Sequence, residues 1–365
     1  MSNRTLIILS VVAVSMVCWA VIQAHLSGGY DETVQPMPLL QGLDPATVGR
    51  ITLTGEGQTI TLQRRGEGFV VTNKEDYPAD IGRINELIRD CMGIRVTHVV
   101  SDDSDYYAEF GVTEDTAETI VKFFDGDGKL LAGLILGKDA DDAGVYVRAA
   151  DEDTVYIVEQ PPTLDTAAMD YVDETLIDVP LEKVASVAIR GGDPDYTLSV
   201  SDDETVALAE MPDGRELDEY AAKSVVRAFD GLRFTDVRRA GEDDPTLTFD
   251  RSAVCQRNDG LVYTVQLART GEQDDDGAWT ARASAEFTGD LPEPVGRDED
   301  DEAVAAKARA LEAYDAAKAF NARHAGWLYT LSDGQAEQLT KPHDELLREP
   351  EPTTQDANGA ATGAN

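Results

Sequence analysis

The stretch that decides the fold is Gly93-Ile-Arg-Val-Thr-His-Val-Val100, because it returns as Gly231-Leu-Arg-Phe-Thr-Asp-Val-Arg238 with four of eight residues identical. Two further blocks recur in the same order: Ile51-Thr-Leu-Thr-Gly55 aligns with Val187-Ala-Ile-Arg-Gly191, and Val145-Tyr-Val-Arg-Ala149 aligns with Trp279-Thr-Ala-Arg-Ala283. The spacing between copies is close to 136 residues. Three blocks in one order predict two tandem copies of a single structural unit.

Strand patterns dominate each copy. Ile51, Leu53, Ile60 and Leu62 alternate with polar residues around a Gly-rich turn, which is typical of a β-hairpin. Further short apolar runs with turns between them follow: Phe69 to Val71, Ile120 to Phe124, Leu130 to Leu136, Val145 to Arg148 and Val155 to Val158. This order predicts a mainly antiparallel sheet.

One helix is expected in each copy. Between Pro78 and Met92 the apolar residues recur at helical spacing, and the second copy offers Tyr220, Val225, Val226 and Phe229. Both segments end at a glycine, Gly93 or Gly231, the residue that best tolerates a left-handed turn at a helix C-terminus. The predicted fold class is therefore α+β: two tandem antiparallel units, each covered on one face by a helix, after one N-terminal transmembrane helix.

The chain divides into seven predicted segments. These are an N-terminal anchor at 1–24, a tether at 25–47, a first repeat at 48–160, a linker at 161–180, a second repeat at 181–290, a C-terminal helix-strand-helix at 291–348 and a disordered tail at 349–365. The C-terminal part departs from the repeat. Its elements are an Ala-rich helix at 299–323, a strand at Trp327 to Leu331 and a closing helix from Asp333 to Arg348.

The N-terminal run is apolar from Leu6 to Ile22 and continues through Ala24. At 1.5 Å per residue such a helix spans about 26 to 30 Å, enough for the hydrocarbon core of a bilayer. Arg4 precedes the run and no Lys or Arg follows it until Arg50, so the positive-inside rule leaves the N-terminus in the cytoplasm. We expect a single-pass protein of a bacterial inner membrane, bound to the lipid bilayer through Leu6 to Ala24, with its body periplasmic or otherwise extracytoplasmic.

Two alternatives to an uncleaved anchor stay open. Cleavage after Ala24 would make the segment a signal peptide, although Ile22 then stands where a small residue is favoured. Lipid modification of Cys18 would make the protein a lipoprotein, although Val17 fits that signal poorly.

Charge restricts the partners. With 70 acidic and 31 basic residues the formal net charge is −39, which repels phosphate backbones and anionic headgroups. We therefore expect no nucleic-acid partner.

No cofactor, metal or catalytic site is predicted. Asp139, Asp141 and Gly144 begin like a calcium loop, but Ala150 stands where the bidentate Glu is needed, and the turn from Glu272 fails in the same way at Ala283. The four histidines are scattered, and His98 is replaced by Asp236 in the second copy. Cys91 and Cys255 form either one disulfide or two unpaired buried thiols.

The candidate ligand groove or interface consists of the aromatic residues Trp279, Trp327, Tyr329, Tyr106 and Tyr107. Packing in a core or an interface is the alternative fate of such side chains.

Several of these segments resemble a bacterial family grouped as domain of unknown function 4340. The resemblance covers roughly residues 48 to 290 and is carried by the apolar anchor, Phe69-Val-Val-Thr-Asn73, Tyr77-Pro-Ala-Asp80, Phe110-Gly-Val112, Asp127-Gly128, Leu136-Gly137 and Val145-Tyr-Val-Arg148, with a weaker echo at Arg323-His-Ala-Gly-Trp327. Phe110 stands where a Tyr is more usual.

The resemblance implies no catalytic residue. It implies a noncatalytic accessory protein of an ABC-type, gliding-motility-like transport complex, whose partners are a separate permease and its associated subunits. A free-standing module that binds an envelope polymer or another ligand is the alternative, and a hydrolase that uses unpaired acids is the third hypothesis.

Overall fold

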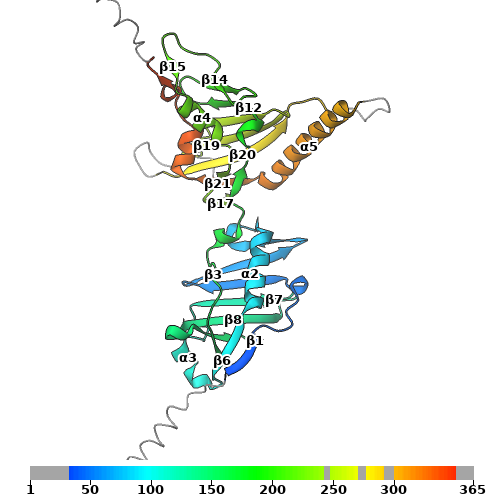
Figure 1. The fold of residues 1–365 in the computed structure, drawn as a ribbon, viewed down its shortest axis with the longest axis vertical. Coiled ribbons are helices and arrows are strands. Elements are labelled where there is room, and N and C mark those ends of the chain that lie inside the picture. The colour runs from blue at the N-terminus through cyan, green and yellow to red at the C-terminus, as the bar shows by residue number, and fades with distance from the viewer. Residues whose placement is uncertain (1–32, 242–246, 270–276, 292–299, 351–365) are drawn as a thin grey trace, which may run out of the picture. The chain divides into compact units, whose positions relative to one another are not determined.

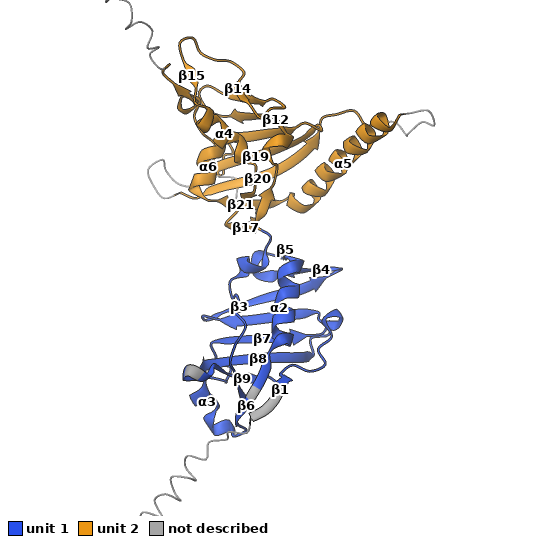
Figure 2. Ribbon diagram, viewed as in Figure 1, with its two compact units in different colours: residues 1–173 blue, residues 174–365 orange. Residues whose placement is uncertain are grey.

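The computed structural model describes residues 33–241, 247–269, 277–291 and 300–350. The chain divides into two compact units, residues 1–173 (unit 1) and 174–365 (unit 2) (Figure 2). Each unit combines a mostly antiparallel sheet with few helices, which is the α+β class that the sequence predicts.

Unit 1 is built on a ten-stranded sheet in which all neighbouring strands are antiparallel. In order across the sheet these strands are β1 (Thr33–Pro38), β6 (Arg95–Ser101), β10 (Val155–Val158), β9 (Val145–Ala149), β8 (Leu130–Asp139), β7 (Thr119–Phe124), β2 (Arg50–Gly55), β3 (Gln58–Arg65), β4 (Gly68–Val71) and β5 (Tyr77–Pro78) (Figure 1).

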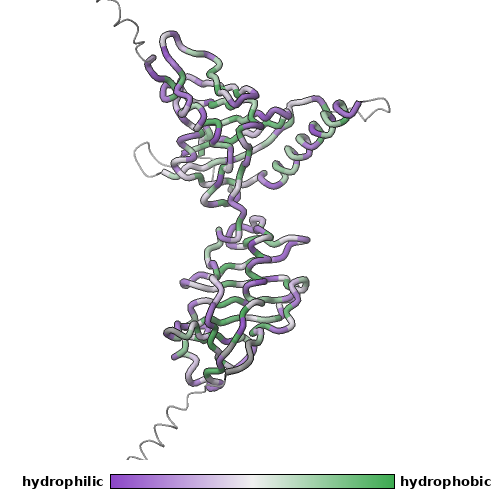
Figure 3. The backbone as a smooth tube through the Cα atoms, in the orientation of Figure 1, coloured by the Kyte–Doolittle hydropathy of each residue, from purple (hydrophilic) through white to green (hydrophobic). Residues whose placement is uncertain are grey.

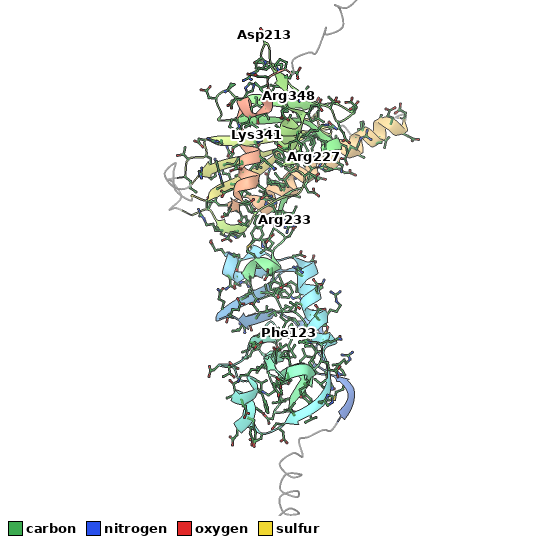
Figure 4. The ribbon with its side chains drawn as sticks, turned by 60° about the vertical axis from the view of Figure 1, so that its left-hand side comes forward. Phe123, Asp213, Arg227, Arg233, Lys341 and Arg348 are labelled. Carbon is green, nitrogen blue, oxygen red and sulfur yellow. The ribbon has the colours of Figure 1, made fainter. Side chains whose placement is uncertain are left out.

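Alternation along the strands gives this sheet one apolar face. Ile51 and Leu53 pair with Phe123 and Val121, and all four are fully buried; Phe123 is labelled in Figure 4. The apolar stripe of helix α2 (Ile81–Gly93) is also buried, and it comprises Ile84, Leu87, Ile88 and Cys91. On the opposite face, α3 (Tyr107–Phe110) and its flanks cover part of the sheet, where Val112, Ile120, Ile135 and Val155 form a smaller core cluster.

Unit 2 contains an eight-stranded antiparallel sheet. Its strands, in order, are β14 (Val206–Leu208), β13 (Tyr196–Val200), β12 (Val184–Arg190), β18 (Arg251–Arg257), β19 (Leu261–Arg269), β20 (Trp279–Phe287), β21 (Trp327–Leu331) and β17 (Asp236–Arg239). Two small sheets pair β11 (Thr175–Ile177) with β16 (Leu232–Arg233), and β15 (Glu216–Leu217) with β22 (Leu347–Arg348). Helix α4 (Glu219–Arg227) buries Ala222, Val225 and Val226.

The strand order of unit 2 follows that of unit 1 position by position. Across the sheet, β4-β3-β2-β7-β8-β9-β10-β6 in unit 1 corresponds to β14-β13-β12-β18-β19-β20-β21-β17 in unit 2. The order along the chain is the same in both series. In the tube coloured by hydropathy, strands in both units carry hydrophobic residues and the connecting loops are largely hydrophilic (Figure 3).

Helix α5 (Asp301–His324) interrupts this correspondence. It lies in the connection between β20 and β21, where unit 1 joins β9 to β10 by a short turn after Ala149. Ala313 and Ala317 pack against Leu261 and Ala285 of the sheet. The first three turns of α5, by contrast, bury no side chain.

The structure moves two predicted segment boundaries. Residues 25–47 were expected to form a tether, yet β1 pairs with β6 from Thr33 and a 3-10 helix follows at Pro45–Thr47. Within the predicted linker, 161–180, the 3-10 helix Ala168–Tyr171 closes unit 1 and β11 opens unit 2. Backbone hydrogen bonding to distant strands, which local composition does not reveal, is the physical reason for both differences.

Three helix predictions also change. The closing helix from Asp333 to Arg348 is shorter, because α6 (Asp333–Leu339) ends before Pro342 and a 3-10 helix follows at His343–Leu346. Gly231 has the expected positive φ of 68°, whereas Gly93 lies inside α2. Tyr220 is 87% exposed because it stands at the first turn of α4 and not on its buried stripe.

No helix among the described residues is both long and apolar enough to cross a membrane. The predicted span, Leu6 to Ala24, and nearly all of the predicted tail lie outside the described ranges.

Candidate functional site

The five predicted aromatic residues do not form one groove within either unit. Trp279, Trp327 and Tyr329 belong to β20 and β21 of unit 2, whereas Tyr106 and Tyr107 belong to unit 1. Four of the five are at least partly buried, and only Tyr106 is as much as 49% exposed.

In unit 2 the aromatic residues are part of the core. Tyr329 is fully buried, its hydroxyl lies 2.6 Å from Nδ1 of buried His324, and its ring packs 4.8 Å from that of Phe234. Trp279 and Trp327 are nearly buried beneath arginines, with the Arg239 guanidinium 4.3 Å from the Trp327 ring. Cation–π contacts of this kind stabilise the fold and leave little aromatic surface for a ligand.

In unit 1 Tyr107 holds a loop in place. The Tyr107 hydroxyl donates to the Asp153 carbonyl, and the Arg148 guanidinium stacks 4.7 Å above its ring. Burial and the nearby Asp153 carboxylate raise the pKa of Tyr107, so the phenol stays protonated and remains a donor at neutral pH.

A better candidate for a contact surface is the polar face of β2, β3 and β7 in unit 1. Cross-strand pairing places Thr52 beside Thr61 and Lys122, and Thr54 beside Thr59. These side chains are partly or fully exposed, and the Thr54 and Thr59 hydroxyls lie 2.9 Å apart. The Lys122 ammonium donates to Glu114 at 2.6 Å, so its charge is neutralised locally.

Unit 2 has a polar face of the same kind. Register places Ser199, Ser186 and Gln256 in one row, and Thr197, Ala188, Val254, Thr264 and Ser284 in the next. A third row contains Gln266 and Arg282, and the Arg282 guanidinium donates to the Gln266 side chain at 2.7 Å. The rows carry hydroxyls, amides and guanidinium groups, with Glu286 as their single carboxylate.

These two faces carry few carboxylates, although the whole chain has a formal net charge of −39. Hydroxyl and amide groups can form hydrogen bonds with a partner surface that is uncharged or carries charges of both signs. Burying them does not require the desolvation of an ion. We therefore regard the two polar sheet faces as candidate interfaces. The sequence held a signal for them, because Thr52, Thr54, Thr59 and Thr61 alternate with the apolar residues that predicted the hairpin.

The residues considered for chemistry do not assemble into a reactive group. Across the ranges that the structure describes, no three His, Cys, Asp or Glu side chains are arranged to hold a metal ion. Asp139 ends β8, and Asp141 begins a one-turn 3-10 helix. Cys91 and Cys255 are free and buried, and burial raises the pKa of each thiol to about 12. Such thiols are poor nucleophiles at neutral pH.

Comparison with known proteins identifies one family. No curated protein and no solved structure matches the chain. Residues 70–251 match the model of Domain of unknown function (DUF4340), and this range runs from β4 of unit 1 to the start of β18 in unit 2. The match agrees with the resemblance carried by Phe110-Gly-Val112 and Val145-Tyr-Val-Arg148. The chain is a member of the DUF4340 family.

Proposed function

We propose that this chain is a noncatalytic accessory protein, tethered to a bacterial inner membrane, which acts outside the cytoplasm beside the permease of an ABC-type transport complex. The observation that carries its binding role is the pair of broad polar sheet faces, one in each unit, which present hydrogen-bonding side chains with few carboxylates.

A noncatalytic role is consistent with the described ranges, in which no three His, Cys, Asp or Glu side chains are arranged to hold a metal ion. Both body cysteines have pKa values raised to about 12, and the His324 ring nitrogen is engaged by the Tyr329 hydroxyl. Nucleophilic catalysis requires a lowered pKa or an adjacent base.

Membrane attachment is supported by the apolar run from Leu6 to Ala24, and the outward orientation is supported by Arg4. The link to an ABC-type permease rests on the family resemblance alone and is an analogy.

We further propose that the two units are tandem copies of one ancestral unit. Support comes from the shared strand order and from helices α2 and α4, each of which is capped by an aspartate. The helix α5 then represents an insertion into one hairpin of the second copy.

Affinity purification from mild detergent tests the partner. A tag after residue 350 should recover an ABC-type permease together with the chain, and a polar-face variant with Thr52→Glu and Thr61→Glu should recover less of it. A matched variant with two acids at exposed positions of α5 in unit 2, Ala306→Glu and Ala316→Glu, should recover the wild-type amount. Repeated recovery of the chain alone would refute the proposal.

A second candidate is an envelope-polymer binding module, which the same hydroxyl-rich faces favour. Pull-down of the purified chain on insoluble cell-wall polymer separates the two. Retention that is lost in the Thr52→Glu, Thr61→Glu variant, without any permease in the eluate, would favour polymer binding.

A further inference from the structure

Unit 2 contains a cavity of about 530 Å³ that none of the five predicted aromatic residues lines and that shares Thr197 with the edge of the polar face. It lies beside β13 and β14, between the end of β12 and the 3-10 helix His343–Leu346. This volume is within the range of small-molecule sites, roughly 300 to 1,000 Å³. It is large enough for a ligand with an aromatic ring or a short aliphatic chain.

The cavity wall is mixed: polar residues that include Arg190, Thr197 and His343 line it, beside an apolar part that is held in place. Tyr196 is buried and donates its hydroxyl to the Lys341 carbonyl at 2.9 Å, which fixes its ring at the wall. Leu208 and Pro212 also line the cavity, and Met211, which is 43% exposed, stands at its rim. These side chains suit the apolar body of a ligand.

Acidic groups give the cavity its polarity. Glu210 lines it and has no hydrogen bond or ion pair with any described residue. Asp195 is fixed by the Gly191 amide at 2.8 Å and lies 3.9 Å from Arg190. The Arg190 guanidinium is itself held by the Tyr196 carbonyl at 3.0 Å and the Thr197 hydroxyl at 3.3 Å. Arg190, Asp195 and Glu210 thus line one cavity, and Glu210 is the carboxylate without a partner among the described residues.

In unit 1 the residue that corresponds to Glu210 by strand position is bonded to its own sheet. Asn73, two residues after β4, accepts from the Thr61 amide at 2.8 Å and donates to the Thr59 carbonyl at 2.9 Å. Glu210 stands two residues after β14 and makes no such contact within the described part of unit 2. The residue that follows the strand is thus bonded to the sheet in unit 1, whereas Glu210 has no partner among the described residues of unit 2.

We propose that this cavity binds a primary amine with an apolar body, either a small free amine or the side chain of a lysine. The ammonium group pairs with Glu210 and Asp195, and the apolar body packs on Tyr196, Leu208 and Met211. The net charge of −39 raises the local concentration of cations and assists the encounter. This inference stands apart from the proposed transport role, because it concerns a pocket inside unit 2 and no permease.

Methyl NMR on the full chain tests the proposal directly. The six methionines are labelled at the terminal methyl group, and the Met211 resonance is assigned with Met211→Leu. Phenethylamine is then titrated, with phenethyl alcohol as the neutral control of the same shape. A parallel titration with N-acetyl-lysine methylamide distinguishes a lysine side chain from a free amine.

We expect a saturable shift of the Met211 resonance with phenethylamine or with the lysine derivative. The alcohol should cause no such shift, and the Met169 resonance of unit 1 should not move. Glu210→Gln should weaken binding about fivefold, which is typical of one partly exposed ion pair. Ala209→Phe, which fills the cavity, should abolish the shift. Ala207→Phe, on a β14 position that does not line the cavity, should leave it unchanged. Equal shifts for amine and alcohol, a shift that survives Ala209→Phe, or no saturable shift with either amine would overturn the proposal.

Discussion

Asp80 and Asp218 hold equivalent positions in the two units. Each carboxylate accepts from the backbone amides two and three residues ahead, at the start of α2 and α4. Each aspartate also donates its own amide, at 2.8 Å, to the last residue of a 3-10 helix from far along the chain: Asp80 to the Tyr171 carbonyl and Asp218 to the Leu346 carbonyl. A single residue thus starts the helix and fastens the end of each unit to it.

Replacing either aspartate should therefore destabilise its own unit. Asp80→Ala and Asp218→Ala should each cost about 1 kcal/mol, the usual value of a helix N-cap, whereas Asp→Asn at either position should cost little. The described tryptophans, Trp279 and Trp327, both lie in unit 2, so fluorescence in urea should report Asp218→Ala and circular dichroism should report both variants. A fluorescence midpoint that moves equally with Asp80→Ala would contradict independent caps.

The hydroxyl of Tyr329 should matter more than that of any surface tyrosine. Tyr329→Phe leaves Nδ1 of buried His324 without its 2.6 Å partner, so we expect a loss of about 1 to 3 kcal/mol in unfolding free energy. Tyr220→Phe makes the same chemical change on a side chain that is 87% exposed and should have no measurable effect. Equal urea midpoints for the two variants would show that the buried contact contributes nothing.

Cys91 and Cys255 should resist alkylation until their units unfold. Burial raises the pKa of both thiols from 9.0 to about 12, so at pH 8 almost no thiolate is present. Mass spectrometry after iodoacetamide should find both residues unmodified in buffer and modified in urea. Because the folded-state pKa is the higher one, the stabilisation is complete below pH 9 and is lost as the pH rises toward 12. Rapid labelling in buffer would be evidence against burial.

Much of the fold could be predicted because its signals are local. The hairpin around Gly55 and the helix after Asp80 each depend on neighbouring residues, and the structure has both. Strand β1 could not be predicted in this way. Its sequence contains Pro36 and Pro38, which are typical of a linker, and its partner β6 begins at Arg95, much later in the chain.

The candidate site was harder to predict than the fold, for a related reason. The sequence shows that Trp279 and Tyr329 are large aromatic residues. It does not show whether each ring is exposed to solvent or covered by a neighbouring strand. Only the register between β20 and β21, with Ala281 opposite Tyr329, decides that Tyr329 faces the core. The cavity beside Glu210 depends on contacts between segments more than 100 residues apart, such as that of Tyr196 with Lys341.

The attachment of α5 can be tested with adjacent residues of the same type. Ala317 is buried against the sheet, whereas Ala316 is exposed. Ala317→Asp should release the helix, since an unpaired carboxylate cannot be buried there without a cost of several kcal/mol, and hydrogen exchange across Asp301–His324 should become fast. Ala316→Asp should leave that exchange slow. Slow exchange in both variants would mean that packing on the sheet does not hold α5.

The strand β1 begins at Thr33, and under the proposed membrane attachment this start would set how far the body can stand from the bilayer. If the bilayer span ends at Ala24, only residues 25–32 separate the two. Eight residues reach at most about 26 to 29 Å even when fully extended. Unit 1 would then begin within a few nanometres of the lipid headgroups. Its partners would need to expose a binding surface close to the membrane.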